Sequence, residues 1–280
     1  MKKLLALALG CALTLSLAAC GGSTPTPAPS TSNTETPAPA ESDLAYIKDK
    51  GVMVIGYTVA PPMNYTDDSG VFTGFDTELA TMVCVALGVT PEFQLINWDS
   101  KEVELAGKGI DCVWNGMTLT PEREANMACT IPYCKNAQVV VMKSGADYAD
   151  TASLIGKVVC AEQGSAGQTL IQGDDETDPD PNLAQCEYVP KAVQSDCLLE
   201  VKAGTADAAI LDMTLANSMI GEGTNYSDLV IVDYLAEEDY GVAFRQGSDV
   251  RDEVNALFEK YLTDGTLQTL ADKYNLELPD

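Results

Sequence analysis

The chain has 280 residues, of which 46% are hydrophobic, and a formal net charge of −26 at pH 7. This acidity argues strongly against binding of nucleic acid, which needs a basic surface, and disfavours a peripheral grip on anionic lipid. The chain contains no histidine, which excludes Ser–His and Cys–His catalysis and removes the commonest zinc ligand.

The first 20 residues are typical of an export signal. Lys2 and Lys3 precede an apolar stretch at 4–17, which is too short to span a membrane comfortably. The stretch ends in Leu-Ala-Ala-Cys, and this ending resembles the bacterial lipoprotein signal, whose cysteine becomes the acylated mature N-terminus. We therefore expect residues 1–19 to be removed and Cys20 to anchor the chain in a lipid bilayer. A secretory signal with a chance cysteine is the alternative.

A linker is predicted at 20–43, between the lipidated Cys20 and the folded domain. It consists almost entirely of Ser, Thr, Pro, Ala and Gly. Such a composition cannot bury enough apolar surface to fold, so the segment is predicted to be a disordered, partly extended tether. The anchor and tether together predict a soluble domain on the extracytoplasmic face of the cell membrane.

Strands and helices alternate in the first half of the remaining chain. The predicted order is a strand at 52–57, a helix around 79–87, a strand at 93–96, a helix at 100–106 and a strand at 110–114. This β-α-β-α-β pattern is typical of a parallel sheet with helices on both faces.

The run at 115–123 (Asn-Gly-Met-Thr-Leu-Thr-Pro-Glu-Arg) predicts a helix that starts beside an arginine. Thr120 is a good N-cap, Pro121 suits the first helical position, and Glu122 favours the positive end of the helix dipole. Arg123 then lies in the first turn, near backbone N–H groups without helical partners. A cation beside free N–H groups predicts a site for a small anion. An ordinary capped helix with a surface arginine is the alternative.

A second alternating series follows and predicts a second α/β lobe. Its strands are expected at 139–142, 158–161, 188–189, 208–211, 230–232 and 240–244. Its helices are expected to open at 164–167 and to cover 196–203, 213–220, 249–263 and 265–274. The acidic, proline-broken loop at 173–182 is interpreted as a solvated insertion, because its spacing does not match an EF-hand calcium loop.

Seven cysteines follow Cys20, and no two of them have CxxC spacing. Three of them, Cys84, Cys112 and Cys160, lie in apolar runs and are predicted to be small core residues. A Cys186–Cys197 disulfide is possible, but the sequence does not decide the pairing.

Short matches to one protein family occur in the same order along nearly all of 44–280. They are 54–56 (Val-Ile-Gly), 60–63 (Ala-Pro-Pro-Met), 74–80 (Gly-Phe-Asp-Thr-Glu-Leu-Ala), 109–111 (Gly-Ile-Asp), 115–123, 131–133 (Ile-Pro-Tyr), 138–141 (Gln-Val-Val-Val), 164–165 (Gly-Ser), 207–212 (Asp-Ala-Ala-Ile-Leu-Asp), 240–243 (Tyr-Gly-Val-Ala) and 264–266 (Asp-Gly-Thr). With them the chain resembles the family 3 extracellular solute-binding proteins of polar amino-acid ABC transporters.

The resemblance implies an α/β fold of two lobes, the type II periplasmic-binding-protein-like fold, with the ligand in the cleft between the lobes. Lobe 1 is expected at 44–136 plus 239–280, and lobe 2 at 137–238. The lobes are expected to close on the ligand by a hinge motion.

The resemblance also places the family's ligand contacts on this sequence. Arg123 is expected to clamp the ligand α-carboxylate, and Asp212 to pair with the α-ammonium. The other expected contacts are the Gly116 carbonyl, the Thr118 hydroxyl, the backbone N–H groups of Ser165 and Ala166, and the side chains of Met63 and Tyr65. From the sequence alone, Asp212 could equally be a helix N-cap.

Three further side chains are given structural roles. Asp76 is interpreted as a helix cap, and Trp98 and Trp114 as structural residues, although Trp114 could lie near the pocket wall.

Departures from the family pattern bear on the ligand side chain. The family often places an acid just after the first strand, where it holds basic ligands, and Tyr57-Thr58-Val59 offers none. Ala60 and Met63 stand where aromatic residues are common. These departures predict a neutral or polar amino acid rather than arginine or lysine.

The implied function is non-catalytic capture of an amino acid and its delivery to the permease subunits of an ABC transporter. The protein is expected to be a monomer that needs no cofactor or metal. One alternative is an enzyme of the same fold, such as a dehydratase acting on a cyclic acid, which would need a general acid in the cleft. The other alternative is a ligand-sensing domain.

Overall fold

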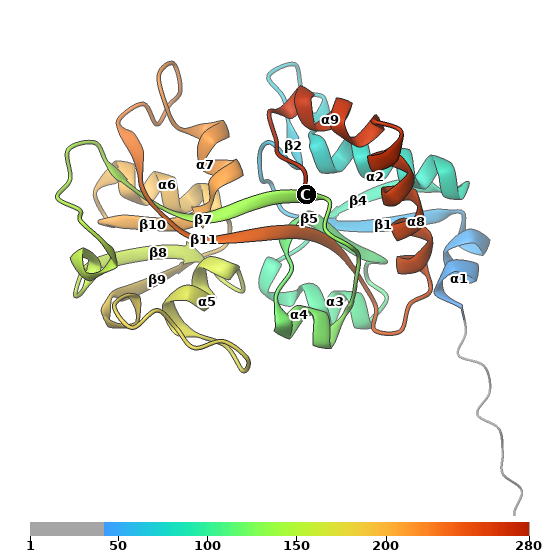
Figure 1. Cartoon of the computed structure of the whole chain (residues 1–280), viewed down its shortest axis with the longest axis horizontal. Coiled ribbons are helices and arrows are strands. Elements are labelled where there is room, and N and C mark those ends of the chain that lie inside the picture. The colour runs from blue at the N-terminus through green and yellow to red at the C-terminus, as the bar shows by residue number, and fades with distance from the viewer. Residues whose placement is uncertain (1–41, 280) are drawn as a thin grey trace, which may run out of the picture. The chain divides into compact units, whose positions relative to one another are not determined.

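The computed structural model describes residues 42–279. The predicted signal peptide and Cys20 lie outside the described residues, as does most of the predicted linker. Within the described part, the main sheet has the strand order β4-β1-β5-β11-β7-β10-β8-β9, with β6 paired to β11. Two groups of elements lie at its two ends, and we call them lobe 1 and lobe 2 (Figure 1).

Lobe 1 is built on three parallel strands. The first strand, β1 (Val52–Tyr57), pairs with β4 (Thr90–Leu95) on one side and β5 (Cys112–Thr118) on the other. A small hairpin of β2 (Tyr65–Thr66) and β3 (Phe72–Thr73) follows β1. The predicted parallel arrangement is therefore present here, and β5 runs four residues beyond the predicted end at residue 114.

Lobe 2 contains the other end of the sheet. Its strand β10 (Ala208–Asp212) is parallel to β8 (Val158–Glu162), which is parallel to β9 (Glu187–Lys191). Each of these strands covers the short apolar run that predicted it. The sheet is nevertheless mixed rather than parallel, because β10 pairs antiparallel with β7.

Two long antiparallel strands connect the lobes. They are β7 (Cys134–Lys143) and β11 (Leu229–Phe244), which pair from Cys134↔Tyr240 to Lys143↔Leu229 and cross the centre of Figure 1. The separate strands predicted at 230–232 and 240–244 are thus one strand. Its pairing with β7 shifts register between Ile231 and Asp233 and again between Tyr234 and Ala236. The two short runs predicted as strands are the two ends of this connection.

Helices cover both faces of the sheet in each lobe. Lobe 1 has α1 (Asp43–Lys50), α2 (Phe75–Leu87), α8 (Val250–Thr263) and α9 (Thr266–Tyr274) in one layer, and α3 (Lys101–Ala106) and α4 (Pro121–Asn126) in the other. Lobe 2 has α6 (Gln194–Ala203) and α7 (Met213–Met219) on one face and α5 (Ala166–Gln172) on the other. The short strand β6 (Ala128–Cys129) pairs with the end of β11.

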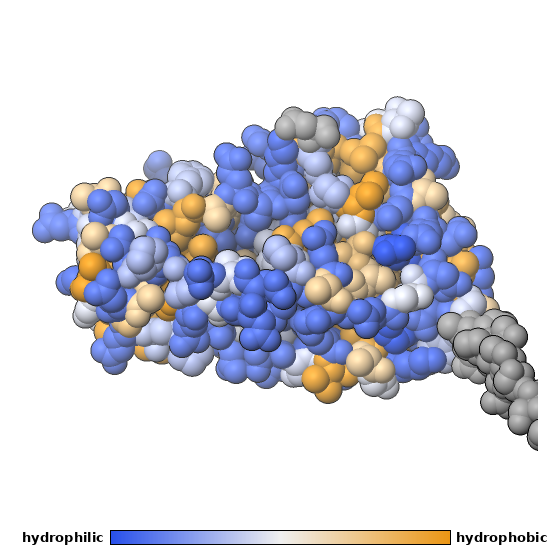
Figure 2. All heavy atoms as spheres, turned by 60° about the horizontal axis from the view of Figure 1, so that its bottom comes forward, coloured by the Kyte–Doolittle hydropathy of each residue, from blue (hydrophilic) through white to orange (hydrophobic). Residues whose placement is uncertain are grey.

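The hydrophobic core follows this layering. One cluster lies beneath α2, α8 and α9, and a smaller one lies beneath α3. Two further clusters occupy the two faces of the lobe 2 sheet. The face in Figure 2 is mainly hydrophilic, and its hydrophobic residues are scattered. No helix within 42–279 has both the length and the apolar character that crossing a bilayer requires.

All seven cysteines between residues 42 and 279 are free. Cys84, Cys112 and Cys160 are fully buried, as predicted for small core residues. Cys186 and Cys197 are both free thiols, so the bridge that the sequence left open is not formed.

Candidate ligand-binding cleft

The helix start predicted at Thr120 forms as expected. The Thr120 hydroxyl accepts the Arg123 N–H at 3.2 Å, and Pro121 is the first residue of α4. The Arg123 side chain is only 5% exposed, so it is not the surface arginine of the alternative interpretation. Its guanidinium donates to the carbonyl oxygens of Thr118 at 2.8 Å and of Gly164 at 3.0 Å. Because Gly164 lies in lobe 2, this cation already contacts both lobes.

The end of β5 is shaped by a buried carboxylate. Gly116 has φ of 56°, and a Cβ atom there would lie 3.0 Å from the Tyr240 ring, so only glycine fits without strain. The Gly116 N–H donates to Asp76 at 2.6 Å, and the Tyr133 hydroxyl donates to the same oxygen at 2.9 Å. The interpretation of Asp76 as a helix cap is therefore wrong, because α2 has Gly74 as its N-cap and Asp76 holds the end of β5 instead.

Asp212 occupies the end of β10 and the N-cap position of α7. Its side chain makes no capping hydrogen bond. Its carboxylate accepts hydrogen bonds from the amides of Gln138 and Gln194, the latter at 2.7 Å. Burial raises the pKa of Asp212, and the hydrogen bonds from the two glutamines oppose the rise. The carboxylate is thus held by two neutral donors rather than by α7.

A second acid lies behind the cleft on β11. One oxygen of Glu238 accepts from Thr118 Oγ1 at 3.0 Å, Asn136 Nδ2 at 2.5 Å and Gln138 Nε2 at 2.9 Å. Burial raises the pKa of Glu238 to about 7, and the neighbouring Asp212 adds to the rise. Glu238 therefore ties the end of β5 to both connecting strands. Sequence reasoning did not single it out.

One cavity brings six of the eight predicted ligand contacts together. Its lining residues are Thr58, Ala60, Trp98, Asn115, Gly116, Thr118, Arg123, Glu162, Ser165, Ala166, Gln194 and Asp212. They come from both lobes. The two predicted contacts outside the lining are Met63 and Tyr65. Met63 is 2% exposed and packs in the core of lobe 1, and Tyr65 lies in the β2–β3 hairpin.

The loop after β1 is fixed by Asn115. Asn115 Oδ1 accepts from the Thr58 N–H at 3.0 Å and from the Thr58 hydroxyl at 2.7 Å. Its amide nitrogen donates to the Thr58 carbonyl and to Asn64 Oδ1. The first residue of the run at 115–123 thus orders one wall of the cavity.

Glu162 and Trp98 also line the cavity, although sequence reasoning assigned neither to the ligand. Glu162 ends β8, and its position at the end of a buried strand was the one available signal, because open α/β sheets place ligands there. Trp98, interpreted from sequence as structural, lies beneath two cations. Its ring centroid is 5.9 Å from the Arg123 guanidinium carbon and 5.1 Å from Lys101 Nζ. Trp114 is fully buried in the core of lobe 1 and does not line the cavity.

The lobes touch each other around this cavity. Lys101 Nζ donates to the Gly164 carbonyl at 3.1 Å, and Gln163 Nε2 donates to Asp99 at 2.9 Å. The Ser218 hydroxyl donates to the Pro61 carbonyl at 3.0 Å. The enclosed volume is about 10 Å³, which is close to the space that one water molecule needs. This space is too small for an amino acid, so we expect the lobes to separate when a ligand enters.

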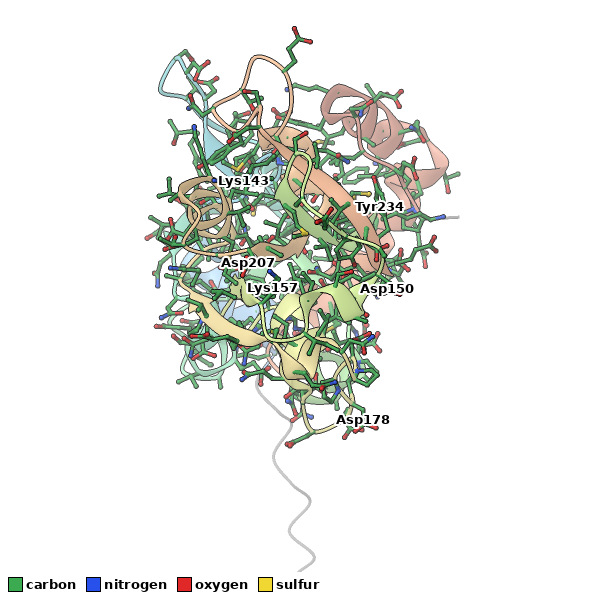
Figure 3. The ribbon with its side chains drawn as sticks, turned by 90° about the vertical axis from the view of Figure 1, so that its left-hand side faces the viewer. Lys143, Asp150, Lys157, Asp178, Asp207 and Tyr234 are labelled. Atoms are coloured by element: carbon green, nitrogen blue, oxygen red, sulfur yellow. The ribbon has the colours of Figure 1, made fainter. Side chains whose placement is uncertain are left out.

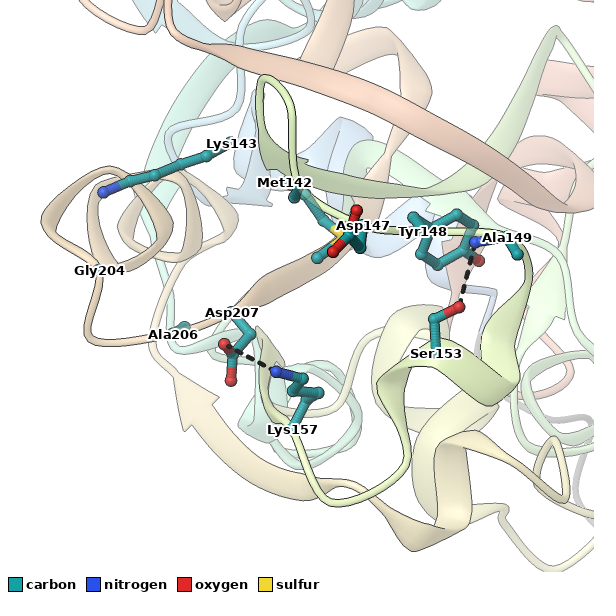
Figure 4. A pocket seen from close by; sticks show the side chains of 11 residues that line it. Met142, Lys143, Asp147, Tyr148, Ala149, Ser153, Lys157, Gly204, Ala206 and Asp207 are labelled. Atoms are coloured by element: carbon teal, nitrogen blue, oxygen red, sulfur yellow. Dashed lines mark hydrogen bonds and ion pairs between the residues drawn. The ribbon is translucent and has the colours of Figure 1, made fainter.

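A larger cavity of about 720 Å³ lies at the end of lobe 2, away from the cleft (Figure 3). Lys157 and Asp207 form an ion pair of 3.9 Å at one side of it, and the Ser153 hydroxyl accepts the Ala149 N–H at 3.1 Å (Figure 4). Its charged groups are exposed and do not converge on one point. The smaller cleft is the better candidate site because its charged side chains are buried and converge.

The cleft suits a small zwitterion. It contains a buried guanidinium from lobe 1 and a buried carboxylate from lobe 2. A guanidinium binds a carboxylate through two parallel hydrogen bonds, and a carboxylate binds an ammonium group. Residues 42–279 contain no group of three or more His, Cys, Asp or Glu side chains that could hold a metal ion.

Two bacterial relatives have names that specify their ligands. The chain is 29% identical over 244 residues to the L-cystine-binding protein TcyJ of Escherichia coli. The aligned residues are 84% of this chain and 86% of the relative. It is 29% identical over 218 residues to the arginine-binding extracellular protein ArtP of Bacillus subtilis, covering 76% of this chain and 81% of the relative.

Solved structures have the same fold. A mutant of the arginine-binding protein ArgBP from T. maritima superimposes with a TM-score of 0.74 at 29% identity, covering 83% of this chain and 98% of that chain. The ancestral amino acid-binding protein AncCDT-1, described as a precursor of cyclohexadienyl dehydratase, gives a TM-score of 0.73 at 27% identity, covering 83% of this chain and 99% of that chain. The predicted two-lobe α/β fold is therefore confirmed. Residues 53–277 match the bacterial extracellular solute-binding proteins, family 3, and the chain belongs to that family of amino-acid-binding components of ABC transporters.

Proposed function

We propose that this protein captures a free amino acid with a neutral or polar side chain between its lobes and delivers it to an ABC transporter permease. One observation carries the proposal. Arg123 from lobe 1 and Asp212 from lobe 2 line the same buried cavity. Arg123 suits the carboxylate and Asp212 suits the ammonium group, and all amino acids share these two groups.

Binding would replace contacts that the cleft makes with itself. Arg123 would exchange its two carbonyl partners for the stronger charge-assisted pair with the ligand carboxylate. Ala166 is the first residue of α5, so its N–H has no partner within the helix and is available to the same carboxylate. Gln138 and Gln194 would keep Asp212 directed at the ammonium group. The opening that admits the ligand would occur about β7 and β11, the strands that join the lobes.

The side-chain preference is proposed from the loop after β1. Tyr57, Thr58 and Val59 carry no charge to hold a basic ligand, and Ala60 supplies no aromatic surface. The two named relatives bind different amino acids by their names, cystine and arginine. Membership of the family therefore leaves the ligand to be decided by residues of this chain.

Location and partners belong to the same proposal. Acylation at Cys20 would hold the protein on the outer face of the cell membrane, where the linker would let the monomeric domain reach the permease. The protein is proposed to act without catalysis or a cofactor.

Labelling with a radioactive fatty acid tests the anchor, because Cys20→Ala is expected to abolish the label and release the protein from membranes. Retention of the label on the variant would disprove the assignment of Cys20.

Isothermal titration calorimetry with the purified protein and a panel of amino acids tests the binding function. We expect saturable binding of at least one neutral or polar amino acid, together with a rise in melting temperature, because a ligand that binds only the native state stabilises it. Arginine binding much tighter than that of every neutral amino acid would overturn the proposed side-chain class. Absence of binding by all of them would overturn the function.

A further inference from the structure

Glu162 is a buried carboxyl group with an unused hydrogen-bonding atom. It ends β8, is 3% exposed and lines the same cavity as Arg123 and Asp212. Among the described residues, its Oε1 has no hydrogen-bond partner. A buried polar atom without a partner loses its hydration and gains nothing in return, so such atoms are rare unless a function retains them.

The groups around Glu162 do not account for its position. The positive charge of Lys101 lowers the pKa of Glu162, but the Lys101 ammonium donates to the carbonyls of Trp98 and Gly164. Burial raises the pKa of Glu162 to about 8, and the charge of Asp212 adds to the rise. Lys101, an amide hydrogen bond from Gln194 and the charge of Arg123 act in the opposite direction.

The proposed zwitterion contacts leave Glu162 without a role. Arg123 is matched to the ligand carboxylate and Asp212 to its ammonium group. Both ends of the amino-acid backbone are then used, and Glu162 is the third ionisable side chain that lines the same small cavity. The remaining part of the ligand is its side chain, which is the part that distinguishes one amino acid from another.

We propose that Glu162 is the specificity-determining residue of the cleft and selects amino acids whose side chains present a nitrogen hydrogen-bond donor. The inference rests on the proposed amino-acid-binding function. Two kinds of side chain share this chemistry. An amide could donate to one Glu162 oxygen and accept from the protonated other, whereas a cationic amine or guanidinium would pair with the ionised carboxylate.

Calorimetric titration of matched ligands tests this selection. Glutamine and norvaline share an unbranched side-chain stem but differ in the terminal amide, and lysine and norleucine differ in the terminal amine. We expect at least one donor-bearing ligand to bind the wild type about tenfold or more tightly than its partner, the effect of one lost hydrogen bond to a buried acceptor. A preference within the glutamine and norvaline pair would identify an amide donor, and a preference within the lysine and norleucine pair would identify a cationic amine.

Variants at Glu162 connect any such preference to this side chain. Glu162→Leu removes the acceptor. We expect this variant to lose its preference for the donor-bearing ligand, so that its affinities for the two ligands of the pair differ by less than about threefold. Glu162→Gln keeps the shape and one acceptor, so it should retain an amide ligand and weaken a cationic one. Glu187 is exposed on the neighbouring strand β9, and the same substitutions there are the controls. They should not change the ratio of the two affinities in either ligand pair.

The outcomes separate this inference from the proposed function. A wild-type protein that binds amino acids without preference for the donor overturns the inference alone. So does a donor preference that survives in both Glu162→Leu and Glu162→Gln, with folding of each verified by thermal unfolding. Selective binding of lysine would support the inference and correct the neutral side-chain class. Failure of every amino acid to bind would overturn both proposals.

Discussion

The two lobes differ in what they bury and in the charge that they bring to the cleft. The core of lobe 1 is aromatic, with Phe258 lying 5.7 Å from Trp114 and 5.6 Å from Tyr133 between ring centroids. The buried residues of the two lobe 2 clusters are aliphatic residues, methionine and cysteines, without an aromatic ring. Aromatic rings therefore contribute to the buried core of lobe 1, whereas the buried residues of the two lobe 2 clusters include none.

At the cleft the two lobes differ in the sign of the charged side chains that they contribute. Lobe 1 contributes Arg123 and Lys101, and lobe 2 contributes Asp212 and Glu162, all of them at most 9% exposed. A buried charge is costly unless it is compensated. In this structure the guanidinium and the ammonium group donate to backbone carbonyls, and the groups of opposite sign lie on the opposite lobe. The comparison indicates that neither lobe alone provides a site for a zwitterion. Bringing the lobes together places Arg123, Asp212 and Glu162 around one cavity.

The aromatic core of lobe 1 predicts the largest effect on stability. Phe258→Ala removes a side chain that packs against Trp114 and Tyr133, and we expect the free energy of unfolding to fall by about 3–5 kcal/mol. Leu199→Ala on the surface of α6, where the leucine is 55% exposed, is the control and should change it by less than about 0.5 kcal/mol. Urea denaturation measures both. A loss below about 1 kcal/mol in Phe258→Ala would contradict the central role of this ring.

The pH dependence of stability sharpens the comparison, because Asp76 is a buried acid in the core of lobe 1. Burial raises its pKa from 3.8 to about 7, against the hydrogen bonds from Gly116 and Tyr133. The native state then holds this proton more tightly than the unfolded chain does, so stability falls as pH rises from about 4 to about 7. At 1.36 kcal/mol per pKa unit, the contribution of Asp76 is at most about 4 kcal/mol.

Asp76→Asn should therefore reduce the loss of stability between pH 4.5 and pH 7.5. Urea denaturation at the two values measures it, and exposed Asp68→Asn controls for the general effect of removing one negative charge. Glu162 and Glu238, whose pKa values are raised to about 8 and about 7, are expected to retain some of the dependence. An unchanged difference between the two pH values in Asp76→Asn would show that Asp76 ionises freely in the native state.

Arg123→Ala tests the cationic half of the cleft. It removes a charge-assisted pair with the ligand carboxylate and should weaken amino-acid binding by about 2–4 kcal/mol. The control is Arg251→Ala on α8, where the side chain is 42% exposed and pairs with its neighbour Asp252. Calorimetry provides both affinities. An affinity within twofold of wild type would remove Arg123 from the site.

Asp212→Asn tests the acidic half and is expected to have the smallest effect, because Asn keeps the shape of the side chain. Amino acids should lose about 1.5–3 kcal/mol of binding free energy, whereas analogues without the α-amino group should lose much less. Exposed Asp196→Asn on α6 is the matched control. Equal losses for a ligand and its deaminated analogue would mean that Asp212 does not contact the ammonium group.

Local signals in the sequence predicted the parts of the fold that local physics decides. Thr120 and Pro121 start α4 where their chemistry requires it, and the helix of 79–87 has its apolar face in the core. The end of β5 was predicted too early, at residue 114. Here the strand continues to Thr118, since Met117 and Thr118 pair with β11. That pairing joins residues more than 100 positions apart, which no local pattern contains.

The site was predictable to the extent that it follows shared motifs. Arg123, Asp212, Gly116 and Thr118 stand in recognisable runs, and the structure brings them to one cavity. Glu162 and Glu238 belong to no such run. Their roles depend on burial and on donors from distant segments, such as Asn136 and Gln138 for Glu238.

The position of Trp98 in the cleft makes its fluorescence sensitive to ligand binding. The chain has two tryptophans, and Trp98 is the one that lines the cavity, with the Arg123 guanidinium carbon and Lys101 Nζ lying 5.9 Å and 5.1 Å from its ring centroid. The emission of an indole responds to nearby charge and hydration. A ligand carboxylate that draws Arg123 from the ring will alter the fluorescence of Trp98, while Trp114, fully buried in lobe 1, supplies a constant background. Trp114→Phe would leave a single emitter, and occupancy of the cleft could then be followed in the unlabelled protein.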